Sequence, residues 1–325
     1  MKPLFLAWVA GLASAASSLA LAAPLHFALI GDAPYNRRES IAFEQMIEDI
    51  NADRDIALVL HAGDIKGSGE PCSDTLLAER LAQLARFARP LIYTPGDNEW
   101  TDCHRPRAGR FLPTERLAAL RRIAYPDPHR SLGRPSIALA TQADDPAWSE
   151  FVENTMVERD GLLFIALHVV GSGNGRAPWR GIDASDSTSQ PRPERVAEIA
   201  RREAAAAAWL EAAFARARRD QLAGVVVLMQ AHPQIEKGEA RRTPFQALLN
   251  QIEARAREFA RPVLLAHGDE HEFFHDSPLA GAPTLQRVQS FGSPVVHWVE
   301  VTFDGAQNPA FRFRPRHVRI PGEGS

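Results

Sequence analysis

The chain reads LHFALIGDAPYN from Leu25 to Asn36, so a largely apolar run stops abruptly at Gly-Asp. The same pattern returns in IALVLHAGD, which ends at Asp64, and in PLIYTPGDNE, which ends at Glu99. Each run has the length and composition of a buried strand, and helical periodicity follows the first two over 40–51 and 75–88. Repeated units of strand, polar loop and helix predict an α/β fold built around a parallel sheet.

The second half of the chain continues the alternation. We expect strands at 162–170, 225–229 and 262–266, helices at 193–219 and 243–259, and edge strands at 295–303 and 310–313. The segment 104–160 is rich in Arg, Pro and Asp and is expected to form long loops with one helix near 114–123. No stretch has the composition of a linker, so residues 23–325 are predicted to form a single domain.

The first 22 residues differ from the rest. Lys2 precedes an uncharged run rich in Leu and Ala that ends in Ala20-Leu21-Ala22, which is typical of a secretory signal peptide cut after Ala22. A membrane anchor is the alternative, because the run is nearly long enough to span a bilayer. We therefore expect a periplasmic or secreted protein with no transmembrane segment in the mature chain. The net charge of −3 gives no basic footprint for nucleic acid.

Polar clusters follow five of the expected strands. They contain Asp32, Asp64, the run Asp97 to Glu99, His232, and the stretch HGDEH from 267 to 271. Ligands of open α/β sheets bind beyond the carboxyl ends of the strands, so these side chains should converge. Several carboxylates cannot stay ionised in a small volume without a compensating cation. The pattern therefore indicates a metal site, with a solvated acidic rim as the alternative.

The stretches GDAP, GDIKGSG, GDNE, QAHP and GDEH resemble, in order and spacing, the motifs of the calcineurin-like metallophosphoesterase family. That family carries D-x-H, G-D-x-x-D/N, G-N-H-D/E, an isolated His and G-H-x-H. The resemblance covers the chain from Phe27 to Trp298. It implies a four-layer α/β/β/α sandwich with a metal site at the C-terminal ends of the strands. It also implies hydrolysis of a small phosphate mono- or diester by metal-activated water.

The resemblance also implies roles for individual residues. Asp64 would bridge two ions, Asp32 and His271 would hold the first, and the second would be held by Asp97, His232 and Asp269. Asn98 would face the substrate, and Glu99 would support it from behind. His267 is an alternative to Asp269 as a ligand.

Four positions depart from the family motifs. Pro34, Asn98 and Asp269 stand where the family has histidines, and Asp97 stands where it has asparagine. The added carboxylates favour one or two hard divalent ions, with Mn, Mg, Fe or Ca preferred over Zn. They also repel a phosphate. The candidates to compensate that charge and bind substrate are Lys66, Arg176, Arg37 and Arg38, each of which could equally be a solvated surface charge.

The missing histidines leave other functions open. The first alternative is a catalytically degenerate metal- or ligand-binding protein on the same fold. The second is an unrelated α/β hydrolase, in which the His168 strand and the GSGNG loop (171–175) would belong to the substrate site. If the chain is the phosphoesterase that the resemblance implies, His168 is instead expected to be a core histidine.

The chain contains two cysteines, Cys72 and Cys103. An isolated pair in an oxidising compartment favours a disulfide bond, with free thiols or a metal pair as alternatives. Cys72 follows the Asp64 loop and Cys103 follows the Asp97 loop. A bridge between them would tie two ligand loops together.

Overall fold

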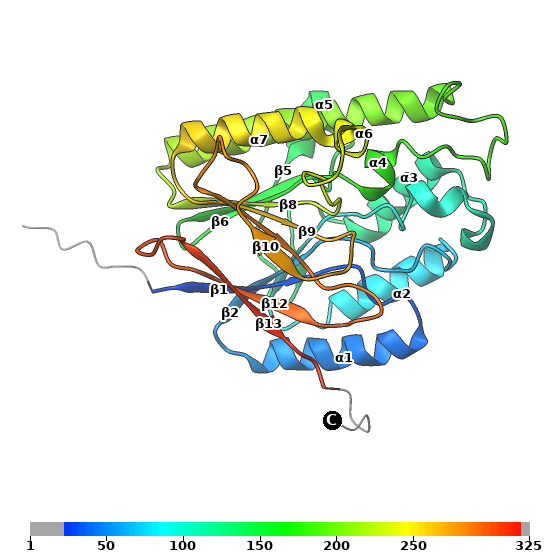
Figure 1. Ribbon diagram of the computed structural model, residues 1–325. Helices are drawn as coiled ribbons and strands as arrows, with labels where there is room; N and C mark the ends of the chain where they lie inside the picture. The colour runs from blue at the N-terminus through cyan, green and yellow to red at the C-terminus, as the bar shows by residue number, and fades with distance from the viewer. Residues whose placement is uncertain (1–22, 320–325) are drawn as a thin grey trace, which may run out of the picture.

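The structure is a computed structural model that describes residues 23–319. The predicted signal peptide therefore lies outside the described residues. Two sheets form the centre of the molecule (Figure 1). The first has the order β13 (Phe311–Arg316), β12 (Trp298–Phe303), β1 (Leu25–Ile30), β2 (Ile56–His61), β3 (Pro90–Tyr93), β4 (Leu132–Gly133). The second has the order β10 (Phe274–Asp276), β11 (Leu285–Gln289), β9 (Val263–His267), β8 (Gly224–Leu228), β7 (Leu162–Ala166), β6 (Thr155–Arg159), β5 (Ala140–Thr141).

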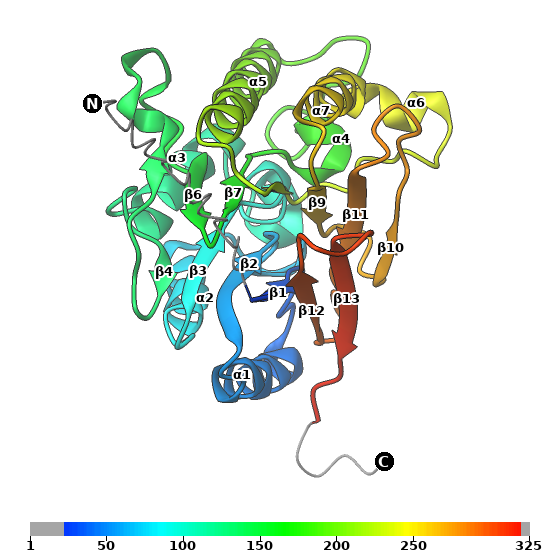
Figure 2. The ribbon, with the colours of Figure 1, turned by 90° about the vertical axis from the view of Figure 1, so that its left-hand side faces the viewer.

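Helices cover the outer faces of both sheets (Figures 1 and 2). The first sheet is covered by α1 (Arg37–Ala52) and α2 (Asp74–Leu84), and the second by α5 (Pro193–Arg219) and α7 (Gln246–Phe259). The remaining helices are α3 (Pro113–Ala124), the short α4 (Gly171–Gly175) and α6 (Glu239–Arg242), and the 3₁₀ turns η1 (Thr101–His104), η2 (Pro106–Ala108), η3 (Gln142–Asp144), η4 (Pro146–Trp148) and η5 (Thr243–Phe245). Within residues 23–319, no helix is both long enough and apolar enough to cross a bilayer.

The opening strand shows why this sequence makes layers. Side chains alternate between the two faces of a strand, so Phe27 and Leu29 of β1 pack between the two sheets. Ala28 and Ile30 point the other way and pack against α1. A strand covered on both faces needs apolar residues at nearly every position, which is what the run LHFALI provides. A third core lies between the second sheet and α5 and α7.

Three apolar interfaces separate four layers, so the predicted α/β/β/α sandwich is confirmed. Strands β1, β2 and β3 run parallel, as do β7, β8, β9 and β11. The helix 193–219 has the predicted bounds, and β1, β2 and β3 are formed by the apolar runs that precede the three Gly-Asp stretches. The segment 104–160 is more structured than expected, because it adds β4 as an edge strand of the first sheet, and β6 and the edge strand β5 to the second.

Candidate functional site

The loops after β1, β2, β3 and β9 bring four aspartates to one edge of the sandwich. The backbone N–H of Asp269 donates to both carboxylate oxygens of Asp32, at 3.1 Å each. A Cβ placed on Gly171 would lie 2.5 Å from Asp269 Oδ1 and 3.0 Å from Asp97 Oδ1. These contacts show that carboxylates from both sheets meet, as the sequence predicted.

Lack of space for a side chain explains the glycine of the Gly-Asp motif at two positions. A Cβ on Gly96 would lie 2.0 Å from Asp64 Oδ1, and one on Gly268 would lie 2.1 Å from Asp32 Oδ2. In both places a carboxylate from the loop after another strand, β2 of the same sheet for Gly96 and β1 of the facing sheet for Gly268, lies where a side chain would begin. Only glycine leaves that space, so these two glycines admit the aspartates of other motifs.

Four of the six residues predicted to hold metal have left-handed backbone. Their φ angles are 51° for Asp32, 55° for Asp64, 85° for Asp269 and 67° for His271. This conformation costs a non-glycine residue on the order of 1 kcal/mol and gathers at functional sites. The chain thus turns sharply after each strand while a carboxylate or imidazole occupies the turn itself.

The carboxylates repel one another in this enclosed place. Burial, together with the charges of Asp269 and Asp97, raises the pKa of Asp32 well above its ordinary value. Burial and the charges of Asp97 and Glu99 do the same for the pKa of Asp64. Burial and Asp97 raise the pKa of Asp269 to about 7. The cluster therefore lacks positive charge, which a bound cation would supply.

Tyr35 is a site residue that sequence reasoning missed. Its hydroxyl donates to Asp64 Oδ2 at 3.1 Å and accepts from Asn98 Nδ2 at 3.2 Å. The same oxygen lies 3.3 Å from His271 Nε2. Tyr35 follows Pro34, and its hydroxyl lies among Asp64, Asn98 and His271. Burial and Asp64 raise the pKa of Tyr35 well above 10, so the hydroxyl keeps its proton.

The His271 ring turns the lone pair of its Nε2 atom towards the carboxylates. Its Nδ1 lies 2.7 Å from the carbonyl oxygen of Ser293, which can only accept a hydrogen bond. Nδ1 therefore carries the proton of the neutral ring, and Nε2 is the unprotonated nitrogen. Nε2 lies 3.9 Å from Asp32 Oδ1. This is the tautomer that a metal ligand needs.

The structure does not bring the His232 ring to the carboxylates. Its Nε2 lies 2.9 Å from Glu236, and its Nδ1 accepts from the backbone N–H of Gln234 at 3.0 Å. Only the backbone of His232 joins the site, by donating to Asp269 Oδ2 at 3.0 Å. The alternative ligand His267 is fully buried and lies beside the His232 ring, with its Nδ1 3.0 Å from the Gly268 carbonyl oxygen.

The predicted substrate-binding cations lie in different places. Lys66 is fully buried and donates to the Gly67 carbonyl at 2.9 Å. Burial lowers the pKa of Lys66, and the charges of Glu99 and Asp64 oppose this shift. The Lys66 ammonium group therefore interacts with these carboxylates from the protein interior. Arg176 pairs with Glu203 of α5 at 2.7 Å, beside a separate cavity. Arg37 and Arg38, at the start of α1, are exposed.

Asn98 and Glu99 make different contacts around Asp64. Asn98 donates its backbone N–H to Asp64 Oδ1 at 3.0 Å and its side-chain amide to Asp64 Oδ2 at 2.8 Å. Glu99 is fully buried and accepts from the Ile65 backbone N–H and the Tyr93 hydroxyl, both at 2.9 Å. Asn98 is thus at the carboxylates, and Glu99 braces the loops from behind.

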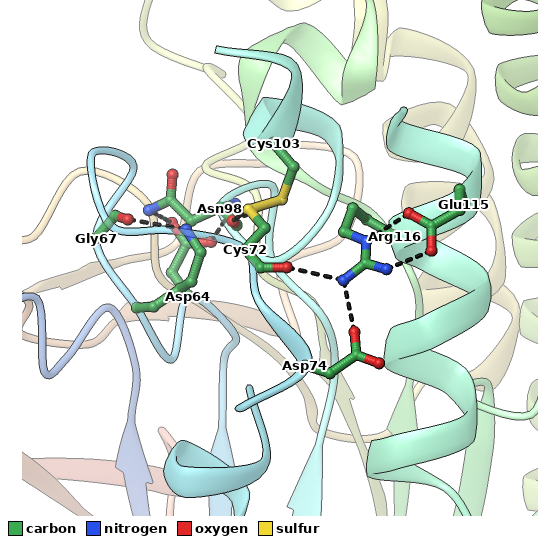
Figure 3. The surroundings of a disulfide bond; sticks show 9 residues. Asp64, Gly67, Cys72, Asp74, Asn98, Cys103, Glu115 and Arg116 are labelled. Carbon is green, nitrogen blue, oxygen red and sulfur yellow. Dashed lines mark hydrogen bonds and ion pairs between the residues drawn. A yellow bond between two sulfur atoms is a disulfide. The ribbon is translucent and has the colours of Figure 1, made fainter. Parts of the chain in front are cut away.

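Cys72 and Cys103 form the predicted disulfide bond, with 5.7 Å between their Cα atoms (Figure 3). Both sulfur atoms lie close to the Asn98 carbonyl oxygen, at 3.5 and 3.6 Å. Arg116 of α3 donates to the Cys72 carbonyl at 2.9 Å and pairs with Asp74. The bridge therefore fixes the Asn98 backbone next to Asp64.

Ser172 in the GSGNG stretch also reaches the site. The stretch forms α4, a left-handed turn with φ of 50° at Ser172, 65° at Gly173 and 57° at Asn174. This turn places Ser172 Oγ 2.7 Å from Asp97 Oδ2 and 3.1 Å from Asp102 Oδ1. The glycine-rich composition signalled a turn, but no spacing rule pointed to the serine.

The donor set fits a hard cation by its chemistry, because it offers carboxylate oxygens, an amide and one preset imidazole. The spatial arrangement of these side chains fits an ion less well than their chemistry does. In the described part of the chain, no three His, Cys, Asp or Glu side chains are grouped so as to hold an ion together. The ligand assignments therefore stay predictions.

No protein-family model matches the chain, and no curated protein is similar to it in sequence. Solved structures with a similar fold include GAP50, the anchor in the inner membrane complex of Plasmodium, at 11% identity and a TM-score of 0.47, covering 91% of this chain and 89% of that one. The NAD nucleotidase of Haemophilus influenzae is similar at 14% identity and a TM-score of 0.46, covering 92% of this chain and 50% of that one. A purple acid phosphatase from yellow lupin is similar at 11% identity and a TM-score of 0.46, covering 92% and 53%. The chain thus spans about half the length of the nucleotidase and the phosphatase, and at this level of similarity their activities do not pass to it.

Proposed function

We propose that the protein is an exported, cation-dependent hydrolase of small phosphate mono- or diesters. The observation that carries the proposal is the meeting of Asp32, Asp64, Asp97 and Asp269 beside an imidazole whose lone pair faces them. The raised pKa values of Asp32, Asp64 and Asp269 mean that the folded chain holds these three groups at a cost unless a cation neutralises them. The disulfide bond supports export, because such bonds persist in oxidising compartments.

When bound, a divalent cation would lower the pKa of water and neutralise charge on the phosphate. The residues to hold it are the four aspartates and His271. Tyr35 stays protonated, and its hydroxyl, which donates to Asp64 in the cation-free protein, would turn to an oxygen of the substrate once a cation neutralises Asp64. Asn98, fixed by the disulfide, presents its amide beside Asp64. Lys66 offsets part of the carboxylate charge from the interior, which limits the repulsion of an anionic substrate.

The test is hydrolysis of 4-nitrophenyl phosphate and bis(4-nitrophenyl) phosphate by chelator-treated protein with added Mn²⁺, Mg²⁺, Fe²⁺ or Ca²⁺. We expect cation-dependent turnover in the parent protein and a loss of at least 100-fold in Asp64→Asn. Asp55→Asn is the matched control, because Asp55 is exposed and remote from the cluster. Turnover that is independent of added cation, or equal in both variants, would overturn the proposal.

The second candidate is a cation- or ligand-binding protein without catalysis. The observation that favours it is the His232 ring, whose two nitrogens are engaged by Glu236 and Gln234. A complete second ion site would need that ring. Tight binding of a cation with no turnover on either ester would select this candidate.

A further inference from the structure

Arg105 lies beside the carboxylate cluster, at the turn between η1 and η2. Its Nη2 atom forms an ion pair with Asp102 Oδ2 at 2.7 Å. The other oxygen of this carboxyl group, Oδ1, lies 3.1 Å from Ser172 Oγ. Ser172 Oγ in turn lies 2.7 Å from Asp97 Oδ2. Three polar contacts in series therefore connect the Arg105 guanidinium to an aspartate of the cluster.

The guanidinium reaches solvent although its partner does not. The Asp102 side chain is 3% exposed, whereas the Arg105 side chain is 41% exposed. Ser172, on the other side of the same carboxyl group, is also partly exposed. A buried carboxyl group thus lies between two groups that reach the surface. This arrangement puts the guanidinium at the rim of the cluster rather than inside it.

The backbone of Arg105 is held on both sides. Its N–H donates to the Asp102 carbonyl oxygen at 3.0 Å, and its carbonyl oxygen accepts from the N–H groups of Ala108 at 3.0 Å and Arg110 at 3.2 Å. Cys103, two residues earlier, is in the disulfide bond. A fixed backbone and a buried ion-pair partner restrict the side chain. Less conformational freedom is therefore lost when the guanidinium binds an anion.

The guanidinium also has donors that nothing in the protein uses. An arginine side chain carries five N–H groups. Among residues 23–319, the contact with Asp102 is the only ion pair or side-chain hydrogen bond that the Arg105 side chain makes. Its Nε and Nη1 groups are therefore available to an anion. Two neighbouring N–H groups of a guanidinium match two oxygens of a phosphate.

An anionic substrate needs a positive charge at this place, because the aspartates of the cluster repel it. Lys66 is fully buried, and Arg176 pairs with Glu203 beside a separate cavity. Arg105 combines access to solvent with a connection to Asp97. It can therefore meet a substrate that approaches the cluster from solvent.

We propose that Arg105 binds a terminal phosphate oxygen of the substrate and makes the site prefer phosphate monoesters to diesters. The inference rests on the hydrolase function proposed above and names its substrate class. A monoester is mostly dianionic at pH 8, because its second pKa is about 6, and it has three terminal oxygens. A diester has one charge and two such oxygens. The added charge and oxygen of the monoester are what a guanidinium at the rim would recognise.

The test compares kcat/KM for 4-nitrophenyl phosphate with kcat/KM for bis(4-nitrophenyl) phosphate, at pH 8 with Mn²⁺, in the disulfide-intact mature chain. The parent protein should prefer the monoester. Arg105→Gln should lower the monoester-to-diester ratio about tenfold or more, mainly through a higher KM for the monoester. Arg105→Lys keeps the charge and should recover part of the ratio.

Arg107→Gln is the matched control, because it removes an exposed arginine of η2 and should leave the ratio within about twofold. The ratio of two constants measured on one protein does not depend on the fraction that is folded. A purely structural role of Arg105 would therefore lower both constants and leave their ratio unchanged.

Calorimetry with phenylphosphonate, a monoester analogue that is not hydrolysed, gives a readout without turnover. Parent protein with Mn²⁺ should bind it, and Arg105→Gln should bind it about tenfold more weakly. An unchanged ester ratio, equal phenylphosphonate affinity in both proteins, or no binding to the parent would overturn the inference. Binding that depends on Arg105 without turnover of either ester would overturn the hydrolase function and support the anion site.

Discussion

The Tyr35 hydroxyl lies 3.1 Å from Asp64 Oδ2 and 3.3 Å from His271 Nε2. It therefore links the loop after β2 of the first sheet to the loop after β9 of the second sheet. No charged group of the cluster occupies this central position. A neutral hydroxyl does: it donates to Asp64 Oδ2 and accepts from the side-chain amide of Asn98. Removal of the Tyr35 hydroxyl oxygen should therefore test the chemistry that we propose for the site.

Tyr35→Phe should lower kcat about 10- to 100-fold with KM changed less than threefold, because a proton donor to the reacting phosphate is lost while the carboxylates remain. Steady-state kinetics on an aryl phosphate measure both constants. Tyr125→Phe is the control, since it removes a hydroxyl that contacts the Tyr93 carbonyl instead. Equal effects of the two substitutions would show that Tyr35 has only a structural role.

The Cys72–Cys103 bond should stabilise the fold. It closes a loop with a sequence separation of 31, for which chain entropy gives about 4 kcal/mol. Urea unfolding of the double variant Cys72→Ser/Cys103→Ser, or of reduced parent protein, should show a free energy of unfolding lower by roughly 2–4 kcal/mol. An unchanged midpoint on reduction would contradict the role we give to the bridge.

His61 should make stability depend on pH. Burial lowers its pKa to about 3, whereas the unfolded chain titrates near 6.5. Below that pH the unfolded state binds a proton that the folded state does not, so stability is full above about 6.5 and falls towards 3. The slope is about 1.4 kcal/mol per pH unit for one histidine.

Unfolding of parent protein and His61→Asn between pH 7.5 and 5 isolates this contribution. Asparagine can still accept from the Gly63 N–H, as His61 Nδ1 does at 3.1 Å. The difference in unfolding free energy between the two proteins should shrink as the pH falls. A difference that is constant with pH would refute the assignment.

Asp269→Asn should stabilise the cation-free protein. The folded pKa of Asp269 is raised to about 7, so its ionisation opposes folding as the pH rises above the unfolded value of about 3.9. We expect a gain of about 1–2 kcal/mol at pH 8 in a chelator, after allowing for altered hydrogen bonds. The gain should be smaller at pH 4.5. Thermal unfolding measures it, and destabilisation at both pH values would contradict the repulsion.

The layers of the fold could be predicted because apolar runs such as Leu25–Ile30 record burial on both faces, and each ends at a turn that the sequence marks with Gly-Asp. The aspartates of the site followed from the same pattern. The short strands β10 and β11 could not, since Gln286, Arg287 and Gln289 of β11 resemble a loop and depend on tertiary partners such as Asp276.

Side-chain orientation was the other limit of the sequence. The motif places His232 at a strand end, but the direction of its ring is set by Glu236, four residues away. Tyr35 falls outside the family motifs, and its contacts come from three separate loops. Neither relationship is visible in spacing along the chain.

The central claim is that the buried aspartates hold a cation, and direct titration tests it. Chelator-treated protein is titrated with Mn²⁺ by calorimetry, in parallel with Asp64→Asn and Asp55→Asn. We predict saturable binding to the parent protein and to Asp55→Asn, and a loss of at least 100-fold in affinity in Asp64→Asn. Equal binding by all three proteins, or no binding of Mn²⁺ to the folded parent, would contradict the account.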